Sequence, residues 1–157
     1  MPRYEEIQTR FWDEPDMQGW SPHAKLLYVY LLTGPLSHGI TGIYPMTRAQ
    51  IQHRTNLKPR QIATSFAAIG PRVRQYAGSW LWIVARFKHG CKSPNHYKAA
   101  LKYLMEEVPA EIVADFCSVY VGSAVDTHYG ARLSTLQGTT KGLRTVPGPY
   151  PDPSPSP

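Results

Sequence analysis

The chain has 157 residues, 42% of them hydrophobic and 11% aromatic, and a formal net charge of +6. This length and apolar content are typical of one folded domain and exclude a mainly disordered chain. No apolar stretch approaches the ~20 residues of a membrane span, and no apolar run follows a basic start as in a signal peptide. The only cysteines, Cys91 and Cys117, make no disulfide framework, so we expect a cytoplasmic protein with reduced thiols and no membrane contact.

The acidic residues are distributed very unevenly along the chain. No Asp or Glu occurs from Met17 to Met105, and these 89 residues carry 12 Lys and Arg and five His. An ordinary protein surface mixes charges of both signs. A surface with positive charges alone produces a field that attracts polyanions, so this pattern predicts a nucleic-acid partner.

Residues 1–20 form an acidic and aromatic N-terminal arm. It holds five of the acidic residues, and Ile7, Phe11 and Trp12 lie among them. We expect a short strand or turn that docks these apolar side chains onto the body of the protein.

The first helix is expected to begin after Ser21, with Ser21 as N-cap and Pro22 in the first helical position, and to end at Gly34. It is apolar on nearly every side, which indicates a central helix. Residues 40–44 then form a short β-prone run.

Two further helices follow, separated by a short turn. Thr47 and Gln50 form a capping box, which predicts a helix over residues 48–55. Residues 56–58 interrupt it, and Pro59 opens a third helix that runs to Ile69.

A hairpin and two more helices complete the predicted elements. Residues 73–76 and 80–84 are β-prone and are joined by Ala-Gly-Ser, which predicts a β-hairpin. Helices are expected over residues 95–107 and 109–120. Residues 122–157 are rich in Gly, Ser, Thr and Pro and predict a flexible tail, extended at its proline-rich end.

The order of these elements predicts an α+β fold. A helix, a strand, two helices joined by a tight turn and a hairpin follow one another in a winged helix-turn-helix, with the hairpin as the wing. We therefore expect residues 21–121 to form one winged-helix domain with two appended C-terminal helices.

The third helix is the predicted reader of DNA. Ile62, Phe66 and Ile69 repeat at helical spacing and are expected to face the core. The predicted contacts on the other face are Arg60, Gln61, Thr64 and Ser65, since Arg and Gln can bind guanine and adenine bidentately. The alternative is an ordinary polar helix face that binds nothing.

The remaining predicted DNA contacts surround this helix. They are Arg48, His53 and Arg54 on the second helix, Lys58 in the turn, Arg72, Arg74 and Tyr76 on the wing, and Arg86 and Lys88 beyond it. We expect Arg74 and Tyr76 to share one face of the hairpin, where an arginine suits a phosphate or a narrow minor groove. The basic cluster of residues 86–98 could extend the DNA track or bind single strands, with Tyr97 as a stacking surface. The alternative in each case is solvated charge.

Neither a metal site nor an enzyme is expected. His89, Cys91, His96 and Cys117 do not have a zinc-ligand spacing. Residues 17–105 contain no carboxylate for acid–base chemistry, and the chain has no glycine-rich phosphate loop. No cofactor is therefore predicted.

Short segments spread over residues 4–120 carry a family resemblance. They are Phe11–Pro15, Ser21–Pro22, Lys25–Pro35, Gly39–Tyr44, Thr55–Leu57, Trp80–Ile83, Phe87–His89, Pro94–Asn95 and Val108–Pro109. In this order they resemble the N-terminal domain of phage and prophage replisome organisers, which is similar to the winged-helix domain of DnaD-like primosomal proteins. No single segment is decisive, but their joint order is fairly specific.

The resemblance implies binding to double-stranded DNA at a replication origin, in the cytoplasm of a bacterial host. It also implies homo-oligomerisation and a helicase or helicase loader as partners. Two alternatives use the same fold, namely a transcriptional regulator and a protein-interaction or oligomerisation module.

Overall fold

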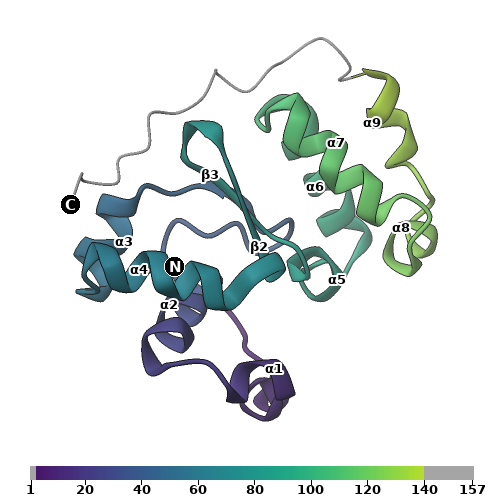
Figure 1. Ribbon diagram of the computed structural model, residues 1–157. Coiled ribbons are helices and arrows are strands. Elements are labelled where there is room, and N and C mark those ends of the chain that lie inside the picture. The colour runs from purple at the N-terminus through teal and green to yellow at the C-terminus, as the bar shows by residue number, and fades with distance from the viewer. Residues whose placement is uncertain (1–2, 140–157) are drawn as a thin grey trace.

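The computed structural model describes residues 3–139 (Figure 1). Helices and strands both occur, so the predicted α+β class is confirmed at that level. In chain order the elements are η1 (Thr9–Asp13), α1 (Pro15–Gln18), α2 (Pro22–Thr33), β1 (Ile43–Pro45), α3 (Arg48–Thr55), α4 (Pro59–Ile69), η2 (Gly70–Arg72), β2 (Val73–Tyr76), η3 (Ala77–Ser79), β3 (Trp80–Ile83), α5 (Arg86–Gly90), α6 (Pro94–Glu106), α7 (Ala110–Tyr120), α8 (Ala124–His128) and α9 (Ser134–Thr139).

The three strands form an antiparallel sheet in the order β1-β3-β2, and β3 pairs with both neighbours. Alternate residues of a strand point to opposite faces. Leu81 and Ile83 pack on one face into a core shared with α2, α3 and α4, whereas Trp82 packs on the other with α6 and α7. The sheet therefore lies between two helical layers, as Figure 1 shows.

The helices of the first layer begin and end as their capping residues predict. Ser21 Oγ accepts a hydrogen bond from the Ala24 amide at the start of α2. Thr47 and Gln50 form the predicted capping box of α3. Asn56, in the left-handed conformation with φ of 60°, ends α3, and α4 follows at Pro59. These local signals set the tight turn between α3 and α4.

The second layer extends further than the sequence prediction. Residues 122–139 were expected to belong to a flexible tail, but they contain α8 and α9, and Leu133 and Leu136 are buried against α7. The start of the basic cluster of residues 86–98, where no helix was predicted, contains the short helix α5. The proline-rich segment from residue 147 lies outside the described residues.

Asp126 holds α8 and α9 to the rest of this layer. Its carboxylate is 1% exposed and accepts hydrogen bonds from the Tyr97 hydroxyl and from the amides of Gly122 and Leu133. A buried carboxylate is tolerated when donors surround it in this way. In the sequence, the signals of these helices that the prediction missed are Asp126 and the leucines at positions 133 and 136. This pattern is too short to predict a helix.

We predict that Asp126→Ala lowers the free energy of unfolding by about 3 kcal/mol, because three donors lose their buried acceptor. Urea denaturation measures this change. The control is Thr127→Ala, an exposed neighbour on the same helix. Equal stability of the two variants would contradict a structural role for residues 124–139.

The N-terminal arm contains η1 and α1 rather than the strand or turn expected. Phe11 is buried and its ring stacks on Tyr28, with 5.9 Å between centroids. Met17 is also buried, whereas Trp12 is 60% exposed. The prediction that the arm docks its aromatic residues is therefore right for Phe11 and wrong for Trp12.

His38 is a half-buried histidine between the arm and α6. Its Nδ1 accepts a hydrogen bond from the Thr41 amide, and its ring stacks on Tyr103 with 4.0 Å between centroids. Burial, followed by the charge of Arg3, lowers the pKa of His38 to about 4. The neutral imidazole is the form that fits this site.

We predict that the His38 ring titrates near pH 4 in an NMR titration. Between this pH and the unfolded-state pKa of about 6.5, the unfolded chain binds the extra proton, so stability decreases as the pH is lowered through this window. Thermal unfolding at several pH values checks this. The His38→Gln variant should lose that part of the dependence, and a ring that titrates near 6.5 would contradict the prediction.

Candidate nucleic-acid interface

The outer side of α3 and α4 is the strongest candidate for contact with a polyanion. His53, Arg54, Lys58 and Arg60 are all exposed there. Neither helix carries an acidic residue, because both lie inside the acid-free stretch from Met17 to Met105. A short surface with cations and no carboxylate of its own attracts phosphate groups.

The predicted two faces of α4 are largely confirmed. Ile62, Phe66 and Ile69 are buried in the core, and Arg60 and Thr64 are exposed on the opposite side. Ala63, Ala67 and Ala68 are exposed as well, so most of this face is small. Thr64 Oγ1 donates to the Arg60 carbonyl at 2.9 Å, which leaves its lone pairs available to accept from a ligand.

Ser65 does not belong to this face, contrary to the prediction. It is 1% exposed, and its Oγ has no hydrogen-bond partner within the described part of the chain. Ser65 follows Ile62 by three positions, so helical geometry turns it toward the core with Ile62 and Phe66. The prediction placed Ser65 on the exposed face because its side chain is polar.

We predict that Ser65→Ala leaves nucleic-acid binding unchanged and raises the free energy of unfolding by up to about 1 kcal/mol. The variant removes a buried hydroxyl that has no hydrogen-bond partner among residues 3–139, and alanine has a higher helix propensity than serine. Chemical denaturation and a binding titration measure the two effects. The matched variant is Thr64→Ala, at the next and exposed position; a loss of binding confined to Ser65→Ala would overturn the assignment.

Gln61 is only half-exposed, and its side-chain carbonyl oxygen is already engaged in a hydrogen bond. Its Oε1 accepts a hydrogen bond from the Lys58 amide at 2.8 Å, which caps the start of α4. Bidentate binding of adenine needs both the oxygen and the amino group of a glutamine. Gln61 in this state therefore offers only its amino group, and Arg60 remains the better candidate to contact a base.

Arg48 connects α3 to the hairpin. Its guanidinium group donates to Gln75 Oε1 at 2.9 Å and lies 4.4 Å from the centre of the Phe66 ring. Gln75 lies in the predicted wing, and it is exposed on the same sheet side as Val73. Strand alternation from the buried Val73 was the signal that could have placed Gln75 beside α3 and α4.

Arg74 and Tyr76 share a face of β2 as predicted, but that face points away from α4. Arg74 pairs with Trp82 in the sheet, and its guanidinium group lies 5.0 Å from the Trp82 ring centre. The Tyr76 hydroxyl donates to Asp115 of α7 at 2.8 Å. Because their faces alternate with those of Val73 and Gln75, these two residues lie with the second helical layer and not beside Arg60.

Arg72 and Arg86 are occupied by acidic residues of the N-terminal arm. Arg72 lies 3.1 Å from Asp16 and 3.8 Å from Glu14. Arg86 lies 2.6 Å from Glu5, and both of these side chains are largely buried. The two arginines are therefore neutralised within the protein, a pairing that crosses more than 50 residues of sequence and that composition alone did not reveal.

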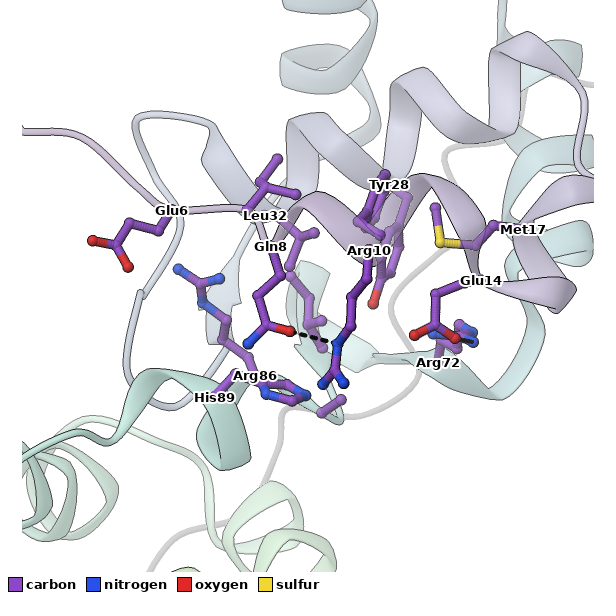
Figure 2. A pocket seen from close by; sticks show the side chains of 14 residues that line it. Glu6, Gln8, Arg10, Glu14, Met17, Tyr28, Leu32, Arg72, Arg86 and His89 are labelled. Carbon is purple, nitrogen blue, oxygen red and sulfur yellow. Dashed lines mark hydrogen bonds and ion pairs between the residues drawn. The ribbon is translucent and has the colours of Figure 1, made fainter.

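The basic cluster that begins at Arg86 also contains both exposed cations and cations paired with the arm. Lys88 is exposed, Lys92 forms a 2.7 Å ion pair with Glu6, and Tyr97 is fully buried, so Tyr97 offers no stacking surface. Figure 2 shows the arm crossing this region, with Arg10, Arg86 and His89 around a pocket there. The pocket has a volume of about 120 Å³. Burial, followed by the charge of Lys88, lowers the pKa of His89.

Protein-family models, curated proteins and solved structures contain no match to this chain. Within residues 3–139 no three His, Cys, Asp or Glu side chains are grouped so as to hold a metal ion. No helix in that range has both the length and the apolar composition needed to cross a membrane.

The structure thus brings together only part of the predicted set. Beside α3 and α4 lie Arg48, His53, Arg54, Lys58, Arg60, Gln61 and Thr64, with Gln75 added. Ser65 is buried, and Arg74 and Tyr76 lie on the other face of the sheet. Arg72 and Arg86 are paired with acidic residues of the arm, and Lys88 lies on α5.

Proposed function

We propose that this protein is a winged helix-turn-helix protein that binds double-stranded DNA, with α4 in the major groove and the β2–β3 hairpin as the wing. The element order α2-β1-α3-α4-β2-β3 and the strand order β1-β3-β2 support this. The observation that carries the proposal is the exposed face of α4, which combines Arg60 and Thr64 with small alanines and has no acidic residue.

The chemistry of this face suits a duplex. Arg60, exposed in the first turn of α4, can bind guanine bidentately, and the alanines allow the helix to approach the base edges. Arg54 and Lys58 flank the start of α4 and can bind phosphates, whose charge the helix dipole also attracts. The Arg48–Gln75 hydrogen bond holds the hairpin beside α3.

For the biological role we propose replication initiation in a phage or prophage, with a homo-oligomer and a helicase or helicase loader as partners. This part of the proposal rests on the sequence resemblance alone. A transcriptional regulator with the same DNA-binding mode is the nearest alternative. The two roles are distinguished by comparing binding to replication-origin fragments with binding to promoter fragments.

We predict that Arg60→Ala weakens binding to the preferred duplex by about 1–3 kcal/mol and reduces its preference over other sequences. Fluorescence anisotropy with specific and scrambled duplexes measures both effects. The control is Arg132→Ala, which removes the same charge from an exposed position between α8 and α9. If both variants bind as the parent does, or both lose affinity equally, α4 does not read the DNA.

We also predict that duplex binding weakens steeply with salt. If four or five phosphates are neutralised, the logarithm of the binding constant should decrease with a slope of about −4 against the logarithm of salt concentration, since each phosphate contributes about −0.9. The second alternative, a protein-interaction module, predicts an affinity for its partner that is nearly independent of salt. A flat salt dependence of DNA binding would therefore contradict the proposed function.

A further inference from the structure

The first part of the N-terminal arm covers basic residues of the body with acidic residues of its own. We call residues 3–8, which precede η1, the arm segment. Glu5 is paired with Arg86 of α5, and Glu6 with Lys92, which follows α5 in the chain. More than 80 residues separate the two partners in each pair. The arm segment thus supplies carboxylates to basic residues that lie within the acid-free stretch from Met17 to Met105.

Side chains, rather than backbone pairing, hold the arm segment in place. Residues 3–7 make no backbone–backbone hydrogen bond within the described chain. Ile7 is half-buried and packs against the core. Arg3 donates to the carbonyl and hydroxyl oxygens of Ser37. The following residues are anchored differently, because Phe11 and Met17 are buried in the core. The arm segment can therefore leave the surface while η1 and α1 stay in place.

The surface beneath the arm segment is basic and hollow. A cavity of about 470 Å³ lies between the arm segment and the body. Arg3, Glu5 and Glu6 line it from the arm segment, and Arg86, His89, Lys92 and His96 line it from the body. The smaller cavity of Figure 2 shares Arg86 and His89 with it. Lys88 is exposed nearby on α5. A groove with several cations and space between them can accept a chain of phosphate groups.

We propose that Arg86, Lys88 and Lys92 form a second binding surface for the phosphodiester backbone of a nucleic acid, and that the arm segment occupies Arg86 and Lys92 in the free protein as an internal competitor. Glu5 and Glu6 occupy cations that phosphates also bind. This inference rests on the proposed function, because it takes the same class of ligand. It concerns a different set of residues, since Arg86 and Lys88 belong to α5 and Lys92 follows it, whereas the proposed duplex contacts lie on α3 and α4.

The two ion pairs differ in how easily a nucleic acid replaces them. Glu6 and Lys92 are 73% and 57% exposed, and such pairs contribute little to stability. Glu5 and Arg86 are only 14% and 11% exposed, so breaking this pair leaves a charge buried without its partner. Displacement therefore begins at Glu6 and Lys92, which makes this pair the one to test.

The experiment compares Glu6→Gln with Asp13→Asn in the full chain. Both variants remove one exposed carboxylate from the arm, but only Glu6 is paired with a cation of the proposed surface. Binding to single-stranded and to duplex oligonucleotides is measured at several salt concentrations, and thermal unfolding confirms that each variant is folded. The two oligonucleotides show which form of the backbone the surface accepts.

We expect Glu6→Gln to bind at least one of the oligonucleotides about two- to fivefold more tightly than Asp13→Asn at low salt, because an internal ion pair no longer has to be broken. Its salt slope should be steeper by about 0.7 for a single strand or 0.9 for a duplex, the value for one added phosphate contact. The double variant Glu6→Gln/Lys92→Gln should lose this gain. Identical affinities and slopes for Glu6→Gln and Asp13→Asn with both oligonucleotides would overturn the inference.

The Arg60→Ala variant separates this inference from the proposed function. If the parent reads a duplex through Arg60 while Glu6→Gln and Asp13→Asn behave alike, the function stands and the second surface does not exist. If the Glu6→Gln gain persists in an Arg60→Ala background, the second surface acts independently of α4. If the parent and both arm variants fail to bind either oligonucleotide, both proposals are wrong.

Discussion

The central strand β3 is the constraint on which the rest of the structure depends. It pairs with β1 and β2, and its side chains alternate between two cores, with Leu81 and Ile83 on one side and Trp82 on the other. A sheet buried on both faces needs a helical layer on each. One layer contains α2, α3 and α4 and leaves the outer side of α4 exposed; the other contains α5 to α9. Every assignment of a side chain to a binding surface follows from this division.

The same division changes the meaning of the basic composition. The acid-free stretch suggested one continuous positive surface, but the cations separate into two groups in the structure. Those on α3 and α4 have no acidic residue from their own helices beside them, whereas Arg72, Arg86 and Lys92 are paired with acidic residues of the arm. Charge counted along the sequence therefore overestimates the field that the folded protein offers. It also hides a surface whose charge appears only when the arm segment moves.

Most of the helices and the hairpin could be predicted because their signals are local. Ser21, the Thr47–Gln50 capping box and Pro59 each determine a helix start through atoms within a few residues. Most of the errors arise where a partner is distant in sequence. Tyr97 is buried and donates to Asp126, which lies 29 residues further along the chain, and the same carboxylate accepts from the Leu133 amide before α9. Ser65 is polar and still faces the core, since helix geometry and not polarity decides which side it occupies.

By itself the sequence determined the order of the helices and strands from α2 to α7, apart from α5, and the absence of acidic residues from α3 and α4. These properties depend on neighbouring residues and on composition. Only the tertiary structure decided which cations remain exposed, which face of β2 lies beside α4, and that Gln75 rather than Arg74 contacts Arg48. The physical reason is that strand register and long-range ion pairs join residues distant in the chain, and no local pattern records such contacts.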